Sequence, residues 1–271
     1  ADLLARYKAH RDAAFVHNQF VHTILKAAGE AARAVAADAS SPINGASTQC
    51  TPRSLDAPLV QIIDDKAAVS TPNVTYATSE RAAYSHSLQG IVDAVTSEFT
   101  ALTVTAGAGS KDGDSERDLE LLSIVNSNRG SKVHVTVRDN AAIGKNGEYL
   151  SGFATELCDR KLFDVNINLY FFEQHGKCDV DKLFGVIEWL LNHSNLFSAD
   201  QLMSMCTKLK SAGKDAQAFI VDAASLTDYL LLQKLFSTTP VSDIGERSEG
   251  CRLHTNGVLD VCTSVPEAWS F

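Results

Sequence analysis

Apolar positions in residues 2–39 recur at alternating steps of three and four residues. The series is Leu3, Tyr7, His10, Ala14, His17, Val21, Ile24, Ala28, Ala31 and Val35. A repeat of about 3.5 residues is typical of a helix that buries one seam, and the frequent alanines favour helix. The pattern ends at Ser40-Ser41-Pro42, because proline cannot continue a helix. We therefore predict a long helical arm over residues 1–41.

The length of this arm leaves two placements open. A continuous helix over residues 2–39 would span about 57 Å at 1.5 Å per residue, more than the diameter of a compact domain of this size. The arm therefore either projects toward a partner, most simply another copy of the chain, or bends near Gly29 across its own domain. If it projects, deletion of residues 1–30 should abolish assembly and leave the remainder folded.

Residues 58–175 have the pattern of short strands separated by turns. The expected strands are 59–63, 74–76, 99–105, 119–125, 132–138 and 165–172, with a helix at 85–99. Residues 132–138 alternate apolar and polar side chains, which is typical of a half-buried strand. Asn146-Gly147 is a hairpin-type turn. Together these features predict a central antiparallel β-sandwich.

Helical periodicity returns over residues 179–236. Asp179 can cap the first of these helices. Ser198 and Gln201 have the spacing of a capping box for the second. Residues 237–271 lack periodicity and predict an irregular tail. We therefore expect an α+β protein, with a projecting arm (1–41) and a single α+β domain (42–271).

Charge and hydropathy exclude some classes of function. The 271 residues carry a formal charge of −9 with a pI near 5.3, which disfavours a broad nucleic-acid-binding face. No apolar stretch approaches the ~20 residues of a membrane helix. The first ten residues are amphipathic rather than apolar, so we expect no signal peptide.

The six cysteines leave the redox state open. None are spaced as C-x2-C, which disfavours a zinc ribbon or a redox dithiol. Six reduced thiols are favoured, because a chain of this length can bury enough core without disulfides. Three disulfides remain the alternative, with Cys251 and Cys262 close enough in sequence to close a small loop.

Only one segment indicates ligand binding. Gly107, Gly109 and Lys111, with Arg117 nearby, could contact a phosphate through backbone N–H groups and positive charge. The segment does not match the full phosphate-loop pattern, and a solvated glycine turn is the favoured alternative. The histidines lack metal-site spacing, and Cys158 is a weak candidate nucleophile. We therefore predict no enzyme, no metal and no required cofactor.

Residues 132–191 resemble a known family. The strand KVHVTVRDN, the run NGEYLSGFATEL, the segment DRKLF, the strand VNINLYFF and the helix that follows from Asp179 occur in the order found in cypovirus polyhedrins. The order of arm, sandwich and helices also resembles that family. The chain departs from it in having only 6 tyrosines and a longer N-terminal helical region.

The resemblance implies a structural function. Polyhedrins form intracellular crystals, the viral occlusion bodies, which embed and protect virions in the host cytoplasm and dissolve at alkaline pH. It implies a homotrimer, packed into a lattice through the N-terminal helix, with bound nucleotides such as ATP, GTP or CTP. Two alternatives stay open: a motif-less α+β enzyme or small-molecule-binding domain, and a secreted interaction protein with disulfides and with glycans at Asn73 or Asn192.

Overall fold

The fold is described from a computed structural model. The described residues are 2–39, 58–74, 84–104, 113–127, 131–139, 149–150, 162–171, 178–221, 250–254 and 259–262. No helix among them is long and apolar enough to cross a membrane.

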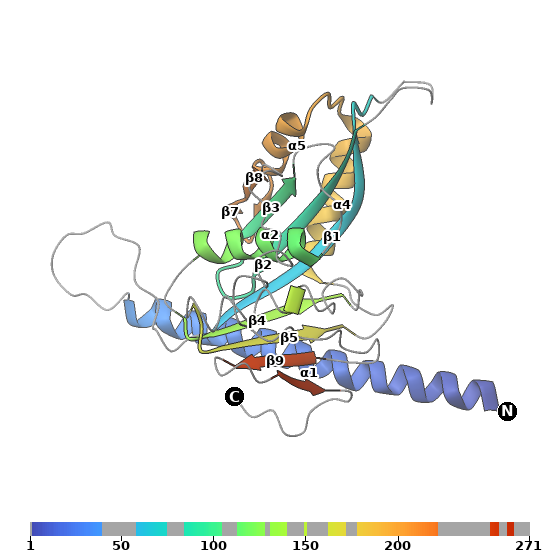
Figure 1. The fold of residues 1–271 in the computed structure, drawn as a ribbon, viewed down its shortest axis with the longest axis vertical. Coiled ribbons are helices and arrows are strands. Elements are labelled where there is room, and N and C mark those ends of the chain that lie inside the picture. The colour runs from blue at the N-terminus through green and yellow to red at the C-terminus, as the bar shows by residue number, and fades with distance from the viewer. Residues whose placement is uncertain are drawn as a thin grey trace, which may run out of the picture.

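The chain contains both helices and a mixed sheet, with runs of consecutive strands between the helices, so the protein is α+β (Figure 1). The helices are α1 (Asp2–Ala39), α2 (Gly113–Asn126), α4 (Asp179–His193) and α5 (Ala199–Cys206). The strands are β1 (Leu59–Thr71), β2 (Tyr84–Asp93), β3 (Phe99–Val104), β4 (Val133–Arg138), β5 (Val165–Tyr170), β6 (Lys210–Ser211), β7 (Lys214–Asp215), β8 (Gln217–Val221), β9 (Gly250–His254) and β10 (Leu259–Cys262).

The larger sheet is mixed. Its strand order is β10-β9-β5-β4-β1-β2-β3-β8, and β6 pairs with β7 in a small separate hairpin. β1, β4 and β5 are mutually parallel, and β8 is parallel to β3, whereas β2 and β9 are antiparallel to both of their neighbours. The predicted antiparallel sandwich is therefore not confirmed, since the described strands of the core form one sheet with helices on its faces.

Two crossovers place helices on opposite faces of this sheet. The connection from β3 to β4 carries α2, and the connection from β5 to β8 carries α4 and α5 in the opposite direction across the sheet. Both connections join parallel strands and are expected to be right-handed. Because they run in opposite directions across the sheet, their helices lie on opposite faces. Gly90 contacts α4 whereas its neighbour Ile91 packs with Leu119 of α2, which confirms this arrangement (Figure 1).

The face beneath α4 and α5 is the main hydrophobic core. Val180, Phe184, Ile187 and Leu191 lie at helical spacing and are buried on β1 and β2. The residue that precedes α4 as N-cap is Cys178 rather than Asp179. The predicted cap of α5 is confirmed, because Ser198 accepts a hydrogen bond from the backbone N–H of Gln201.

The predicted N-terminal helix is present as α1, which is continuous through Gly29. The middle of its seam covers the sheet face that α4 also occupies: Ala14, His17 and Val21 are buried, Val21 against Val135. His17 donates a hydrogen bond from Nε2 to the carbonyl oxygen of Tyr170 at 2.5 Å.

Four secondary-structure predictions are wrong. Residues 85–99 form β2 and a turn instead of a helix, and 119–125 belong to α2 instead of a strand. β8 falls within the segment predicted as helical, and β9 and β10 fall within the tail predicted as irregular. β2 is buried on both faces and therefore lacks the alternation of a half-exposed strand. The tail strands join the sheet because β9 pairs with the distant β5, and local sequence does not encode this pairing.

Candidate functional site

The predicted phosphate segment lies between a strand and a helix. β3 ends at Val104 and α2 begins at Gly113, so the glycine segment joins two elements of the order that a phosphate loop requires. Gly107, Gly109 and Lys111 themselves lie outside the described residues. The predicted turn at Asn146-Gly147 and the candidate nucleophile Cys158 also lie outside them.

Arg117 is the one predicted site residue that the structure describes. It lies on α2, its side chain is only 1% exposed, and it donates hydrogen bonds from Nε and Nη2 to Asp118 Oδ1 at 3.1 and 2.9 Å. Its guanidinium is thus held within the protein by a neighbouring carboxylate. Its contact with a phosphate stays a prediction.

The sheet face beneath α2 is lined with polar side chains. Three strands contribute alternate residues in matching register: Gln61 from β1, His134, Thr136 and Arg138 from β4, and Asn166 and Asn168 from β5. All six are buried. The prediction of a half-buried strand at 132–138 is therefore wrong, because the polar side of β4 faces α2 rather than water.

Five of these side chains are linked by hydrogen bonds, with Thr136 donating from Oγ1 to Asn168 Oδ1 at 2.6 Å. Gln61 donates from Nε2 to Ser123 Oγ of α2 at 3.2 Å, and its Oε1 lies 3.0 Å from His134 Nε2. His134 Nδ1 lies 2.9 Å from Asn166 Nδ2, and Asn168 donates from Nδ2 to Asn166 Oδ1 at 2.6 Å. Gln61 Oε1 can only accept and Asn166 Nδ2 can only donate, so His134 donates from Nε2 and accepts at Nδ1. The imidazole is therefore neutral.

Electrostatics agrees with a neutral imidazole. Burial, and then the positive charge of Arg138, lowers the pKa of His134 to about 3. Its ring also stacks on Phe163, with centroids 4.9 Å apart. His134 is therefore a fixed hydrogen-bonding group at physiological pH rather than a proton carrier.

A buried ion pair adjoins these side chains, with the Tyr149 hydroxyl oxygen 3.5 Å from Asn168 Oδ1. Arg138 donates from Nη2 to Glu120 Oε2 at 2.5 Å, and Tyr149 donates its hydroxyl to the same oxygen at 2.6 Å. Arg138 also lies over the Tyr149 ring, 4.5 Å from its centroid. Burial raises the pKa of Glu120, and Arg138 and Tyr149 oppose this rise. Glu120 Oε1 has no hydrogen-bond partner within the described part of the chain.

Sequence reasoning missed this network, although a signal was present. His134, Thr136 and Arg138 are two residues apart, as are Asn166 and Asn168 on the neighbouring strand. Such alternation is the usual sign of a solvent-facing strand surface. Glu120 and Ser123 on α2 are polar residues that face this side of the sheet, but the pattern of residues 119–125 predicts a strand instead of a helix. The network holds α2 on the sheet by specific polar contacts.

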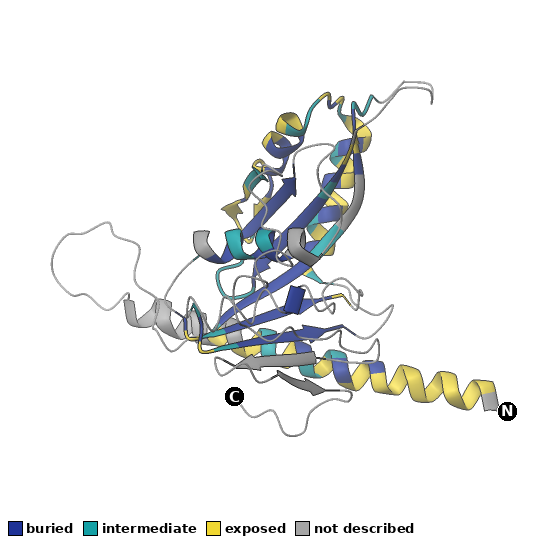
Figure 2. Ribbon diagram, viewed as in Figure 1, coloured by how far each residue is buried: buried dark blue, intermediate teal, exposed yellow. Residues whose placement is uncertain are grey.

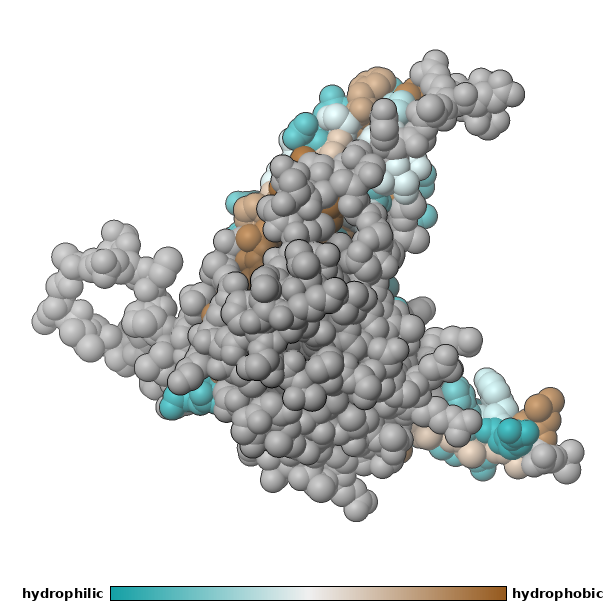
Figure 3. All heavy atoms as spheres, viewed as in Figure 1, coloured by the Kyte–Doolittle hydropathy of each residue, from teal (hydrophilic) through white to brown (hydrophobic). Residues whose placement is uncertain are grey.

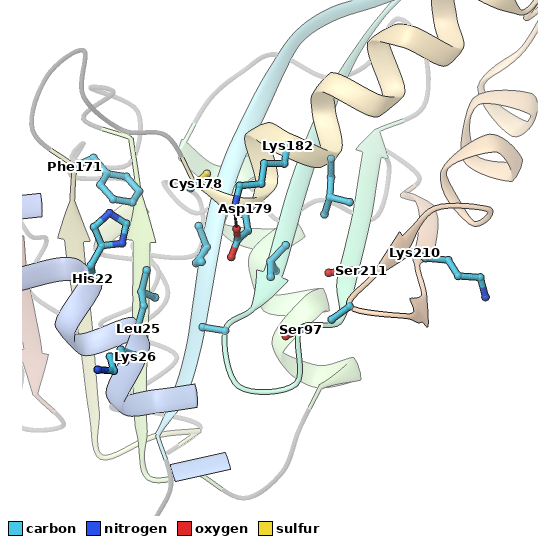
Figure 4. Close-up of a pocket in the computed structure, with 15 residues that line it drawn as sticks. His22, Leu25, Lys26, Ser97, Phe171, Cys178, Asp179, Lys182, Lys210 and Ser211 are labelled. Carbon is cyan, nitrogen blue, oxygen red and sulfur yellow. Dashed lines mark hydrogen bonds and ion pairs between the residues drawn. The ribbon is translucent and has the colours of Figure 1, made fainter. Parts of the chain in front are cut away.

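A cavity of about 620 Å³ lies on the opposite face, between α1 and α4 (Figure 4). Its walls include Leu25 of α1, Ile62 of β1 and Leu183 of α4, together with Phe171. Polar and charged side chains also line the cavity, and two of them, Lys182 and Asp179, form an ion pair at 2.5 Å. A concave site that combines apolar walls with a few polar groups is a usual form of small-molecule site.

Asp64, Cys178 and Asp181 lie together next to this cavity. One ligand atom from each lies within 4.8 Å of the others, a spacing that could hold a metal ion. Burial, and then the charge of Asp181, raises the pKa of Asp64 to about 7. Burial raises the pKa of Cys178 to about 12, so its thiol is protonated at neutral pH. A protonated Asp64 can donate a hydrogen bond to the Asp181 carboxylate, so the two side chains can lie close together without a metal.

Cys178 and Cys206 are free thiols, and Cys206 is buried. Cys251 pairs in register with Val261 and Cys262 with Gly250, so Cys251 and Cys262 are not directly opposed on β9 and β10.

The N-terminal end of α1 exposes large apolar side chains. Leu3, Leu4 and Tyr7 are 81%, 74% and 64% exposed. Figure 2 shows this end of the helix as an exposed segment that extends beyond the sheet, and Figure 3 shows hydrophobic residues gathered near its tip. We call residues 2–12 the free arm. Its seam is the same one that the sheet covers from Ala14 onward.

Comparison of the chain with protein-family models and with curated protein sequences finds no match. The resemblance to polyhedrins therefore stays a prediction from the sequence.

Proposed function

We propose that this chain is a structural protein that assembles with copies of itself through the free arm of α1. The exposure of Leu3, Leu4 and Tyr7 carries the proposal. Fully burying an apolar side chain of this size contributes about 1.5–3 kcal/mol, so leaving three in water on one short segment is costly unless a partner covers them.

One arm contact supports only weak association. Three buried side chains give several kcal/mol before the entropic cost of association, and a dissociation constant of 1 mM corresponds to about −4 kcal/mol. Several arms per oligomer would raise the strength of assembly steeply. Assembly should therefore depend strongly on concentration and be favoured by a trimeric building block, as in polyhedrins.

The test is sedimentation velocity over a range of concentrations. The variant Leu3→Ser/Leu4→Ser/Tyr7→Ser should lose the large species that the unaltered chain forms. The matched control is Ala5→Ser/Ala9→Ser/Ala13→Ser, which makes three exposed serine substitutions on another side of the same helix. Equal assembly of both variants, or no assembly of the unaltered chain, would overturn the proposal.

Point variants are needed because the deletion of residues 1–30 is too severe. Ala14, His17 and Val21 pack on the sheet, so that deletion would also remove core contacts. Loss of assembly on deletion would then not separate an intermolecular role from unfolding.

We further propose, more specifically, that the chain is a viral occlusion body protein of the polyhedrin kind. The sequence resemblance and the free arm support it. In this proposal the chain crystallises in the host cytoplasm around virus particles and holds a nucleotide. Light microscopy of insect cells that express the chain tests it: crystals are expected for the unaltered chain and absent for the arm variant.

A second candidate function is small-molecule binding. The cavity of about 620 Å³ between α1 and α4 favours it. Thermal shift measurements with ATP, GTP and CTP test for a nucleotide. The variant Leu183→Trp would fill the cavity from the α4 side, and it should abolish any shift that comes from this cavity. A shift that persists in this variant would place the nucleotide elsewhere, for example at the Gly107 segment.

A further inference from the structure

A second apolar surface is exposed on α4. Val186 and Trp189 are 46% and 59% exposed, and Phe197, just beyond the helix, is 61% exposed. Val186 and Trp189 lie on the side of α4 opposite its buried residues, in line with Lys182 and His193. Trp189 is held in place by stacking on His193, with ring centroids 4.5 Å apart. We call Val186, Trp189 and Phe197 the α4 patch.

The free arm cannot cover the α4 patch of its own chain. α1 is one continuous helix that is anchored on the sheet at Ala14, His17 and Val21, and the arm continues outward along its axis (Figures 1 and 2). The described residues therefore present two separate exposed apolar surfaces.

The charges of the two surfaces are complementary. The free arm carries three basic residues, Arg6, Lys8 and Arg11, and two acidic residues at its ends, Asp2 and Asp12, so its net charge is +1 (3 − 2). Residues 179–200, which contain the whole patch, have a net charge of −3 (1 − 4), from one lysine and four acidic residues: Lys182, Asp179, Asp181, Glu188 and Asp200. A basic segment meeting an acidic one is favoured in encounter and orientation.

The dimensions also agree. Leu3 and Tyr7 are four residues apart on one side of the arm, and Val186 and Trp189 are three apart on α4. Side chains at these spacings form the ridges that interlock when two helices pack. The arm spans about 15 Å at 1.5 Å per residue, which is shorter than α4 and fits along it.

We propose that the free arm of one copy docks on the α4 patch of a second copy, with Leu3, Leu4 and Tyr7 packed against Val186, Trp189 and Phe197. This inference rests on the proposed self-assembly and names its receptor surface. The contact joins two different surfaces, so each copy can give one arm and receive one. A heterologous contact of this kind builds rings or open arrays rather than closed dimers.

The experiment mixes two full-length variants. The arm variant Leu3→Ser/Leu4→Ser/Tyr7→Ser keeps a working patch, and the patch variant Val186→Ser/Trp189→Ser keeps a working arm. Neither should extend an assembly alone, but the mixture should form complexes that contain both variants, detected by sedimentation velocity with one variant fluorescently labelled. Asn192→Ser, at another exposed position of α4, is the control and should assemble like the unaltered chain.

The outcomes separate this inference from the proposed function. If the unaltered chain assembles and the patch variant assembles equally, the arm docks elsewhere, and the inference is wrong while self-assembly stands. If the mixture shows no complex although both single variants have lost assembly, the direct pairing of arm and patch is wrong. If the unaltered chain does not assemble at any concentration, both proposals fail. Circular dichroism of each variant should match that of the unaltered chain, because all substituted side chains are exposed.

Discussion

Arg138 of β4 and Glu120 of α2 form a hydrogen-bonded ion pair, with Nη2 and Oε2 2.5 Å apart and both side chains buried. The pair joins the middle of the sheet to the helix that covers it. Neither charge can reach water in this position, so each depends on the other and on the Tyr149 hydroxyl.

Arg138→Leu should destabilise the fold by about 3–5 kcal/mol, because it leaves Glu120 buried without its counter-charge. Urea denaturation measures the loss. Glu120→Gln in the same chain should recover much of it, and recovery smaller than about 1 kcal/mol would contradict this account of the pair.

The loss in Arg138→Leu should also depend on pH. Burial already raises the pKa of Glu120 above its unfolded value, and removal of Arg138 removes the main opposing effect. A carboxyl group with a raised folded pKa stays protonated in the fold where the unfolded chain is ionised, so stability falls as pH rises between the two pKa values. The variant should therefore be more stable at pH 5 than at pH 8, relative to the unaltered chain.

Gly90→Ala should destabilise the core beneath α4. A Cβ at this position would come within 2.6 Å of Val180 Cγ1 and 2.8 Å of Phe184 Cζ, so α4 would have to move. Overpacking of this kind costs about 1–3 kcal/mol. Gly185→Ala is the matched control, because its Cβ would have no neighbour within 4 Å and would favour the helix by roughly 0.5–1 kcal/mol. Thermal unfolding should shift in opposite directions for the two variants.

Asp64→Asn should stabilise the protein most at pH 7 and above. Folding raises the pKa of Asp64 from 3.8 to about 7, so its contribution to stability falls as pH rises from about 4 to about 7. The asparagine cannot ionise and can still accept the Asp65 backbone N–H, so the variant should gain about 1–2 kcal/mol at pH 8, after allowance for partial exposure. At pH 4 the two proteins should differ little. An equal difference at both pH values would exclude titration of Asp64 as the cause.

Assembly should be stable near neutral pH and lost above about pH 10. The chain has 13 lysines, 6 tyrosines and 6 cysteines, whose deprotonation adds negative charge to a protein already at −9. Cys178 and Cys206 respond last, because burial raises the pKa of each to about 12, and Tyr149 is likewise raised well above 10. Added salt should partly preserve the assembly by screening the repulsion. Turbidity against pH at two salt concentrations measures this, and persistence at pH 11.5 would contradict an alkaline-soluble occlusion body.

Local pattern was sufficient where one face of an element is buried and the other faces water. The 3.5-residue seam of α1 and the spacing of Phe184, Ile187 and Leu191 in α4 predicted helices that the structure contains. The capping pair Ser198 and Gln201 was also predictable, because a cap depends on residues three apart.

Tertiary structure decided what non-local contact controls. β9 joins the sheet by pairing with β5, which lies some 80 residues earlier in the chain, and β10 joins it through β9. The parallel pairing of β1 with β4 spans the whole of β2, β3 and α2. No local pattern specifies which strands pair, so the sequence pattern does not distinguish an antiparallel sandwich from a mixed sheet.

The same distinction explains the network and the free arm. The alternation of His134, Thr136 and Arg138 determined that β4 has a polar side, but only the position of α2 made that side a buried network instead of a wet surface. Likewise the seam from Leu3 to Val21 determined an apolar stripe on α1, and the extent of the sheet decided that the stripe is covered at Ala14 and uncovered at Leu3. Sequence periodicity sets which side of an element is apolar or polar, whereas the packing of distant segments sets what that side contacts.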